Sequence, residues 1–249
     1  MTRPERQRSC RSGNIAHMLK LDQIKAISLD LDDTLWPVWP IIDRAEQVLH
    51  EWLASNAPLT AAMYASPQAL RAIRDAVGRE RPDLAHDMTA LRRESIRLAL
   101  SNAGEDPQLA GVAFEVFFAE RHKVSFYPDA LPALEFLAAR YPLVSISNGN
   151  ADVSRLEVAP LFVASVSALK VGVSKPDPRI FRVAAEAVGA QPHEVLHVGD
   201  DAVLDVLGAR DAGMQAVWIN REQKPWPQAE KRHPEFADLS ELVAALLSA

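Results

Sequence analysis

Five short apolar segments, separated by stretches with helical periodicity, constrain the fold of this 249-residue chain. Continuous short apolar runs are typical of strands that are buried on both faces of a parallel sheet. The five predicted strands are residues 24–30, 143–147, 162–167, 195–199 and 216–220. The helical stretches that accompany them are residues 129–141, 150–159, 178–189 and 203–212. This alternation predicts an α/β protein with a doubly wound parallel sheet.

One long interval breaks the alternation. Residues 37–124 contain only helix-like segments, which prolines separate from one another. The segments expected to be helical are residues 41–55, 67–79, 84–103 and 107–122. The interval is long enough to form a domain. We therefore expect an α/β core made of residues 21–36 and 125–249, with an all-helical domain inserted at 37–124.

Composition limits the partners of this chain. With 27 basic and 33 acidic residues the formal charge is -6, which is too acidic for a protein held mainly by nucleic acid phosphates. No apolar run approaches the roughly 18 residues of a membrane span, and the single Cys10 cannot form an internal disulfide. We expect a cytoplasmic monomer or homodimer that binds neither membrane nor nucleic acid.

Residues 1–20 are rich in arginine and lack the apolar stretch of a secretion signal, so a disordered tail is expected.

Carboxylates gather directly after the first predicted strand. Asp30, Asp32 and Asp33 lie in the segment DLDDTLW, at the carboxyl edge of a parallel sheet, where open α/β proteins bind ligands. Three neighbouring carboxylates repel one another unless a cation neutralises them, and oxygen ligands of this kind suit Mg²⁺. The segment alone is also compatible with a solvated acidic turn.

A second acidic cluster follows the fourth predicted strand. Asp200 and Asp201 come directly after Gly199, and Asp205 follows on the next helix. Asp201 is also well placed to cap that helix, which would not exclude a role beside a metal.

Two further segments offer groups that bind anions. The second predicted strand ends in Ser147 and Asn148, followed by Gly149, so a hydroxyl, an amide and turned backbone N–H groups are available, although the same sequence also makes a plain turn. Lys175 precedes Pro176 in a loop just before a helix, where proline restricts the backbone. Taken singly, a lysine of this kind is usually a solvated surface charge.

The combination is more specific than its parts. Three strand ends of one sheet supply carboxylates, a hydroxyl turn and carboxylates again, and a lysine lies between the last two. Such a set can bind Mg²⁺ and a phosphoryl group together. In order and spacing, DLDDT, SNG, the Lys175 loop and GDDAVLD resemble the four motifs of the haloacid dehalogenase-like (HAD) superfamily over residues 24–220. The helical insert is similar to that superfamily's type I cap.

The resemblance implies a role for each matching residue. Asp30 resembles the nucleophile that becomes an aspartyl phosphate, and Asp32 resembles the acid that protonates the leaving group and then activates water. Ser147, Asn148 and Lys175 would hold the phosphoryl oxygens. The metal would be held by Asp30, Asp200 and the backbone carbonyl of Asp32, with Asp201 or Asp205 supporting the ligands.

Asp32 also separates activities within the superfamily. True dehalogenases attack carbon, have no alkoxide to protonate, and lack an acid at this position, so the resemblance favours phosphoryl transfer. A phosphomutase stays open because it uses the same four motifs, although mutases of this type commonly carry glycine where this chain has Asp33. A catalytically inactive module that only binds a phosphorylated ligand is disfavoured, because such a module would not need the acid Asp32.

Longer stretches resemble one bacterial branch of phosphatases. This branch dephosphorylates 5-amino-6-(5-phospho-ribitylamino)uracil in riboflavin synthesis and also accepts FMN. The similar stretches are DLDDTLWPVWPII, HDMTALRRESI, PLVSISNGNA, SKPDP and LHVGDDAVLDVLGARDAGMQAVWI. The expected substrate is therefore a small phosphorylated metabolite of this type, with sugar phosphates as an alternative.

Side chains near or within the insert are candidates for substrate choice. The rings of Trp36 and Trp39 are candidates for stacking on an aromatic substrate. Arg92 is a candidate for contact with the phosphate or the substrate, and is otherwise expected on a solvated helix face. His197 lies within a predicted central strand, where a hydrogen-bonded core histidine is expected rather than a metal ligand.

Overall fold

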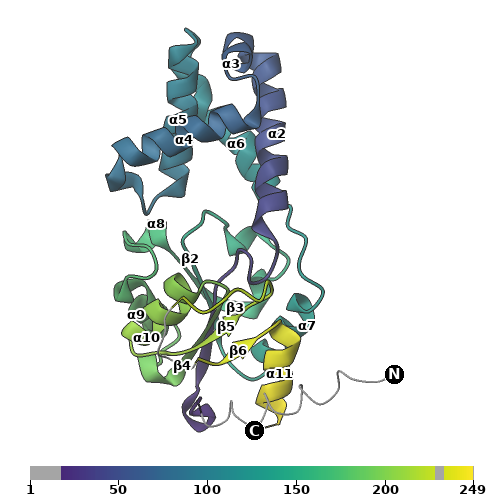
Figure 1. Cartoon of the computed structure of the whole chain (residues 1–249), viewed down its shortest axis with the longest axis vertical. Coiled ribbons are helices and arrows are strands. Elements are labelled where there is room, and N and C mark those ends of the chain that lie inside the picture. Colours follow the sequence, from purple (N-terminus) through teal and green to yellow (C-terminus); the bar gives the residue numbers. More distant parts are fainter. Residues whose placement is uncertain (1–17, 228–232, 249) are drawn as a thin grey trace. The chain divides into compact units, whose positions relative to one another are not determined.

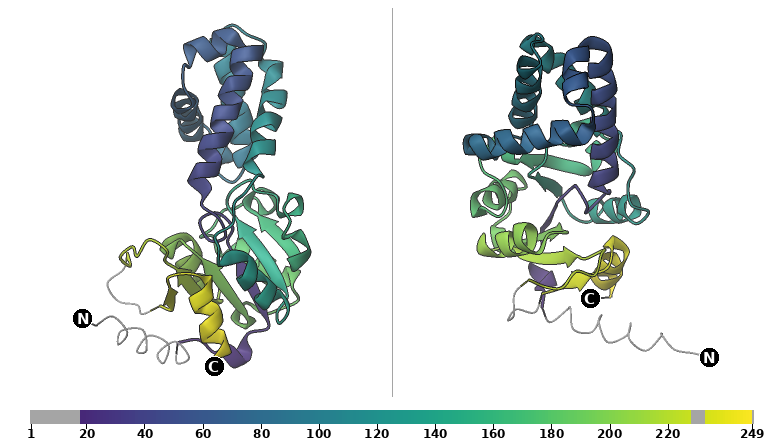
Figure 2. Two further views of the ribbon diagram at one scale, coloured as in Figure 1. Left: turned by 90° about the vertical axis from the view of Figure 1, so that its right-hand side faces the viewer. Right: turned by 45° about the horizontal axis from the view of Figure 1, so that its top comes forward.

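The computed structural model describes residues 18–227 and 233–248 (Figures 1 and 2). Most of the predicted disordered tail, residues 1–17, lies outside the described residues. Residues 18–20 differ from that prediction, because Leu19 is buried and Lys20 is held by two hydrogen bonds. The Lys20 backbone N–H donates to Gln215 Oε1 (2.7 Å), and its carbonyl accepts from Gln215 Nε2 (3.1 Å).

The sheet has six parallel strands in the order β3-β2-β1-β4-β5-β6, which confirms the doubly wound fold. The strands are β1 (Ala26–Leu29), β2 (Leu143–Ser147), β3 (Phe162–Ser167), β4 (Val195–Gly199), β5 (Gln215–Ile219) and β6 (Glu235–Phe236). The chain runs outward from β1 in both directions, to β2 and β3 on one side and to β4, β5 and β6 on the other. Ligands of open α/β sheets bind at such a reversal, beyond the carboxyl ends of the strands.

Helices cover both faces of the sheet (Figure 1). On one side lie α7 (Ala130–Ala138) and α11 (Leu239–Leu247), which pack against each other. The other side carries α8 (Ala168–Val171), α9 (Pro178–Ala187), the π-helix η7 (Ala202–Leu207) and α10 (Gly208–Asp211). Buried Phe181 and Val206 pack there into one apolar cluster with Val144 and Ile146 of β2. No helix of the described residues is long and apolar enough to cross a membrane.

Residues 37–125 form a second compact unit together with residues 148–156. Its helices are α2 (Val38–Asn56), α3 (Pro58–Met63), α4 (Pro67–Glu80), α5 (Met88–Asn102) and α6 (Ala110–Arg121). Proline opens α3 and α4 at the first helical turn, where its missing N–H is not needed. Phe114 and Phe117 of α6 are buried in the apolar centre of this helical unit.

Residues 148–156 differ from the prediction. A helix over 150–159 and membership of the α/β core were expected, whereas the structure has only the short 3₁₀ turns η4 (Val153–Arg155) and η5 (Ala159–Leu161). The backbone N–H of Asp152 donates to His122 Nε2 at 2.9 Å, which ties this segment to the end of α6.

Candidate active site

The end of β1 places Asp30 at the reversal point of the sheet. Leu29 is in register with Ser145 of β2 and with Val198 of β4, and the Asp30 backbone N–H donates to the Val198 carbonyl at 2.9 Å. The Asp30 side chain is therefore buried between the ends of three strands.

Three carboxylates predicted from the sequence meet at this point. One oxygen each of Asp30, Asp200 and Asp205 lies within 4.8 Å of the other two. Asp200 follows β4 directly, and the Trp218 indole N–H fixes its position by donating to its backbone carbonyl at 2.7 Å. The carboxyl ends of parallel strands thus bring together residues that are far apart in the chain.

Lys175 lies within this acidic group. Its Nζ is 2.5 Å from Asp30 Oδ1 and 2.6 Å from Asp205 Oδ1, and the side chain is buried. Burial by itself would lower the pKa of Lys175, but the adjacent Asp205 and Asp30 carboxylates outweigh it and raise that pKa above its usual value. The lysine is a buried cation rather than the solvated charge that single lysines usually provide.

Asp205 is fixed by several donors. Oδ1 accepts from Lys175 and from His197 Nε2 (3.2 Å), and Oδ2 accepts from the Asp201 backbone N–H (2.9 Å). Burial favours the protonated form, but Lys175 and His197 outweigh it and hold the pKa of Asp205 below its usual range. A Cβ on Gly199 would lie 2.3 Å from Asp205 Cγ, so only glycine leaves room for this arrangement. Both carboxylate oxygens of Asp205 accept hydrogen bonds, so Asp205 is better placed to orient Lys175 than to bind a metal ion.

Asp30 and Asp200 have the properties of a site for a hard cation. Burial raises the pKa of Asp30 well above its usual value, and Asp205 and Asp200 add to this while Lys175 opposes it. Burial, with the charges of Asp205 and Asp33, raises the pKa of Asp200 to about 7. Two buried carboxylates that repel each other in this way fit Mg²⁺, which binds oxygen ligands and would offset their charge.

The shifted pKa of Asp200 predicts a pH-dependent stability. An unfolded aspartate loses its proton near pH 4, whereas folded Asp200 keeps its proton to about pH 7. Between these values unfolding releases a proton, so the free energy of unfolding of the metal-free protein falls as the pH rises. Asp200→Asn removes this titration.

Thermal unfolding in the presence of a chelator should therefore show wild type losing stability relative to Asp200→Asn between pH 4 and pH 7. The difference should reach on the order of a few kcal/mol and stay constant above pH 8. A difference that does not change with pH would contradict this protonation of Asp200.

Asp32 is held by a local hydrogen bond. The indole N–H of Trp36 donates to Asp32 Oδ1 at 2.8 Å, and the Trp36 carbonyl accepts from the Asp33 backbone N–H at the same distance. Trp36 is fully buried and packs edge-on against Phe126 (centroids 5.4 Å apart). The expectation that its ring stacks on a substrate is wrong for this structure, because the ring is enclosed and its N–H orients Asp32.

Ser147, Asn148 and Asp201 are the other predicted site residues at the ends of strands. Ser147 is buried at the end of β2, and Asn148, the next residue, begins the segment that belongs with the helical unit. The Asp201 side chain accepts from the backbone N–H groups of Val203 and Leu204, both at 2.8 Å, which confirms it as the cap of η7.

Two predicted specificity residues lie in the helical unit. Trp39 is 56% exposed, and the guanidinium of Arg71 lies 5.3 Å from its ring centroid. Arg92 is buried, donates to Glu46 Oε1 at 3.1 Å and lies 3.7 Å from the ring centroid of Phe117. The solvated face expected for Arg92 is wrong, because this side of α5 packs inside the unit. Its guanidinium is occupied by Glu46, so it is not placed to contact a substrate.

Two residues at the site were not given a role there from the sequence. His197 is the hydrogen-bonded core histidine expected, with Ser28 Oγ at 2.9 Å from Nδ1, but its other nitrogen contacts Asp205. Thr34 Oγ1 lies 3.2 Å from Asp200 Oδ1 and 3.5 Å from Asp30 Oδ2. The sequence signal for His197 is a polar residue inside an apolar strand. The signal for Thr34 is a hydroxyl four residues after the candidate nucleophile Asp30.

Comparisons with known proteins agree with this geometry. A family profile described as haloacid dehalogenase-like hydrolase matches residues 24–213. The 5-amino-6-(5-phospho-D-ribitylamino)uracil phosphatase YigB of Escherichia coli K12 is 32% identical over 91% of this chain and 98% of its own length. The crystal structure of a 2-haloacid dehalogenase from Pseudomonas syringae pv. tomato DC3000 matches with a TM-score of 0.82 and 39% identity, over 90% of this chain and 99% of that one. A HAD phosphatase from Thermococcus onnurineus matches with a TM-score of 0.63 and 26% identity, over 90% and 98%.

Proposed function

Because the chain belongs to the haloacid dehalogenase-like hydrolase family, we propose that it is a Mg²⁺-dependent phosphomonoester hydrolase that works through an aspartyl phosphate. The neighbourhood of Asp30, Asp200 and Lys175 supports this proposal, since it combines a buried nucleophile, a place for a cation and a fixed positive charge. The substrate would be a small phosphorylated metabolite in the cytoplasm.

The carboxyl group of Asp32 is the observation that favours a phosphatase over a haloacid dehalogenase. Relatives of this chain include both phosphatases and haloacid dehalogenases, so overall similarity does not decide between them. A phosphatase needs an acid for the leaving alkoxide, whereas attack on a carbon bearing a halogen does not. This chain has a carboxyl group at the position, and the Trp36 indole holds it in one orientation.

The proposed reaction has two displacements. An oxygen of Asp30 attacks phosphorus, the ester P–O bond breaks, and the leaving oxygen takes a proton from Asp32. Asp32 then takes a proton from water, whose oxygen attacks phosphorus and releases phosphate from Asp30. Lys175, Ser147 and Asn148 would hold the phosphoryl oxygens throughout. Bound Mg²⁺ would be held by Asp30, Asp200 and the Asp32 backbone carbonyl, and would offset the negative charge of the phosphoryl group.

The proposed substrate class is a phosphate ester that carries a flavin or pyrimidine ring. The phosphatase YigB of Escherichia coli, which the chain matches over almost its whole length, supports 5-amino-6-(5-phospho-ribitylamino)uracil as the substrate. The resemblance described in the sequence adds FMN as a second candidate. Sugar phosphates are the alternative class.

A substrate panel tests the proposal directly. The purified protein should release phosphate from p-nitrophenyl phosphate with Mg²⁺ and not with a chelator, and should favour the ribitylaminouracil ester or FMN over phosphoserine and sugar phosphates. Release of halide from 2-chloropropionate without phosphatase activity would instead establish a dehalogenase. Transfer of phosphate between sugar positions would indicate a mutase.

Trp39 is proposed to contribute to recognition of an aromatic substrate, because the residue is 56% exposed on the helical unit. Stacking of aromatic groups contributes roughly 0.5 to 1.5 kcal/mol. Trp39→Ala should therefore lower kcat/KM for FMN by about two- to tenfold relative to ribose 5-phosphate, which has no aromatic ring. Trp39→Phe should retain most of the preference.

Val112 provides the matched control, because it is also 56% exposed on the helical unit. Val112→Ala should leave the ratio of the two substrates unchanged. Equal losses on both substrates with Trp39→Ala would remove Trp39 from the specificity proposal.

A further inference from the structure

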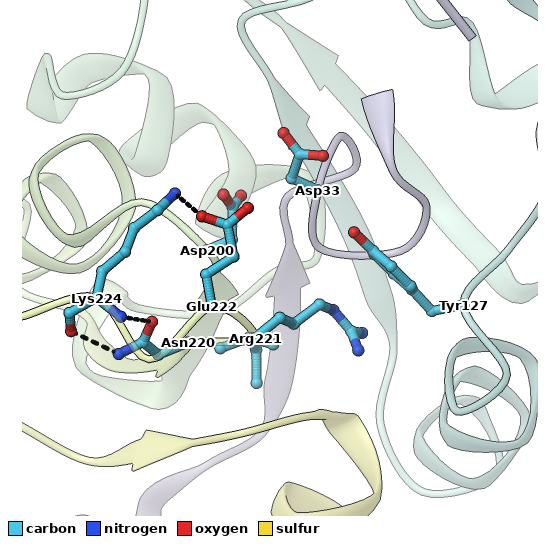
Figure 3. Close-up of a pocket in the computed structure, with 8 residues that line it drawn as sticks. Asp33, Tyr127, Asp200, Asn220, Arg221, Glu222 and Lys224 are labelled. Carbon is cyan, nitrogen blue, oxygen red and sulfur yellow. Dashed lines mark hydrogen bonds and ion pairs between the residues drawn. The ribbon is translucent and has the colours of Figure 1, made fainter. Parts of the chain in front are cut away.

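Arg221, just beyond β5, joins three segments of the α/β core. Its Nη1 and Nη2 donate to the two carboxylate oxygens of Asp129 at 3.0 and 2.9 Å, and Nη2 also donates to the Thr34 backbone carbonyl at 2.8 Å. The guanidinium carbon lies 3.8 Å from the ring centroid of Tyr127. Figure 3 shows the guanidinium directed toward Tyr127, beside a pocket that Asp33 and Asp200 also line.

The contact with Thr34 leads to the acidic group. The Thr34 hydroxyl lies between Asp200 Oδ1 (3.2 Å) and Asp30 Oδ2 (3.5 Å), and its single proton can be donated to only one of them at a time. The position of the hydroxyl depends on the Thr34 backbone, which Arg221 holds. Arg221 therefore acts on the two carboxylates through Thr34 without touching either of them in the contacts described.

The turn that carries Thr34 needs such a restraint. Asp33, its neighbour, has a φ of 59°, in the left-handed region that residues other than glycine seldom adopt. Backbone in this region persists when surrounding contacts determine it. Within residues 33–36 those contacts include the hydrogen bond from the Tyr127 backbone N–H to the Leu35 carbonyl (2.9 Å) and the one from Arg221 to Thr34.

The geometry requires an arginine. The planar fork can engage both oxygens of Asp129 and a carbonyl while its face lies against Tyr127, whereas the compact ammonium of a lysine cannot make this set of contacts. We propose that Arg221 is a positioning residue, which fixes the Asp30–Thr34 turn and so holds Asp30 and Asp200 in the arrangement that binds the cation. This inference rests on the proposed function.

Arg221→Lys tests the inference with two independent measurements. Calorimetric titration with Mg²⁺ alone should show affinity weakened by about ten- to a hundredfold, the range for residues that orient metal ligands. With the best substrate from the panel, kcat at saturating Mg²⁺ should fall by at least about tenfold while KM changes by less than about threefold.

Two controls separate positioning from general stability. Arg179 pairs with Asp177 through Nε (3.0 Å) and Nη2 (2.7 Å) on the surface, so Arg179→Lys should leave both measurements at wild-type values. Leu242→Ala, in the buried face of α11, should lower Tm without changing Mg²⁺ affinity. If Arg221→Lys lowers only Tm, as Leu242→Ala does, Arg221 is a structural residue and the inference is overturned.

Asp129→Asn provides a second variant should Arg221→Lys not fold. It removes the charge that anchors Arg221 and should weaken Mg²⁺ binding in the same direction, whereas unchanged Mg²⁺ affinity would overturn the inference. A wild-type protein that binds Mg²⁺ but hydrolyses no phosphate ester would refute the proposed function, while the titrations would still test Arg221.

Discussion

Asp30→Asn is expected to abolish turnover while the protein remains folded. An amide cannot replace the carboxylate as a nucleophile, and loss of a nucleophile lowers kcat by about four to six orders of magnitude. Folding should be retained, because asparagine has nearly the same shape and Asp30 is a buried carboxylate whose pKa burial raises well above its usual value. In the absence of metal, the variant should remain folded, because buried Lys175 keeps its ion pair with Asp205 at 2.6 Å.

Acid quenching during turnover of a ³²P-labelled substrate measures the covalent step. Wild type should retain protein-bound label of the lability expected for an acyl phosphate, and Asp30→Asn should retain none. Asp211→Asn is a suitable control, since Asp211 is exposed at the end of α10, and it should label like wild type. Near wild-type kcat in Asp30→Asn would refute the covalent mechanism assigned to this residue.

The sheet and the centre of the site could be predicted because both depend on local patterns. Strands β2, β3 and β4 have the predicted bounds, since a buried parallel strand is continuously apolar and ends where polar residues begin. Once the strands are parallel, Asp30 and Asp200 must meet at one edge. Strand β6 and helix α11 were missed because β6 contributes only two residues and α11 lies beyond the last recognised strand.

The contacts that orient the site could not be predicted from local patterns. Arg221 and Asp129 are 92 residues apart, and nothing in the polar loop around Arg221 indicates that it reaches Thr34. Arg92 looks like a surface residue because charged side chains are seldom buried, and only its pairing with Glu46 explains its position. The sequence therefore predicts which groups meet, and tertiary contacts determine how each one is oriented.

Asp32→Asn should slow the reaction by an amount that depends on the leaving group. An alkoxide is a poor leaving group unless it is protonated, so loss of the acid should cost about 10²- to 10⁴-fold with an alkyl phosphate. p-Nitrophenolate leaves readily without a proton, so the first step with p-nitrophenyl phosphate should be affected far less. Mg²⁺ affinity should change little, because only the backbone carbonyl of Asp32 is proposed as a ligand.

Trp36→Phe provides a graded version of the same experiment. Phenylalanine keeps an aromatic ring in the buried site but removes the N–H that donates to Asp32 Oδ1 at 2.8 Å. If this hydrogen bond orients the acid, the variant should show the same dependence on leaving group with a smaller amplitude. The measurement is the slope of log kcat/KM against leaving-group pKa, which should steepen from wild type to Trp36→Phe to Asp32→Asn. Parallel slopes in the three proteins would exclude Asp32 as the proton donor, and the choice of phosphatase over dehalogenase would lose the residue on which it depends.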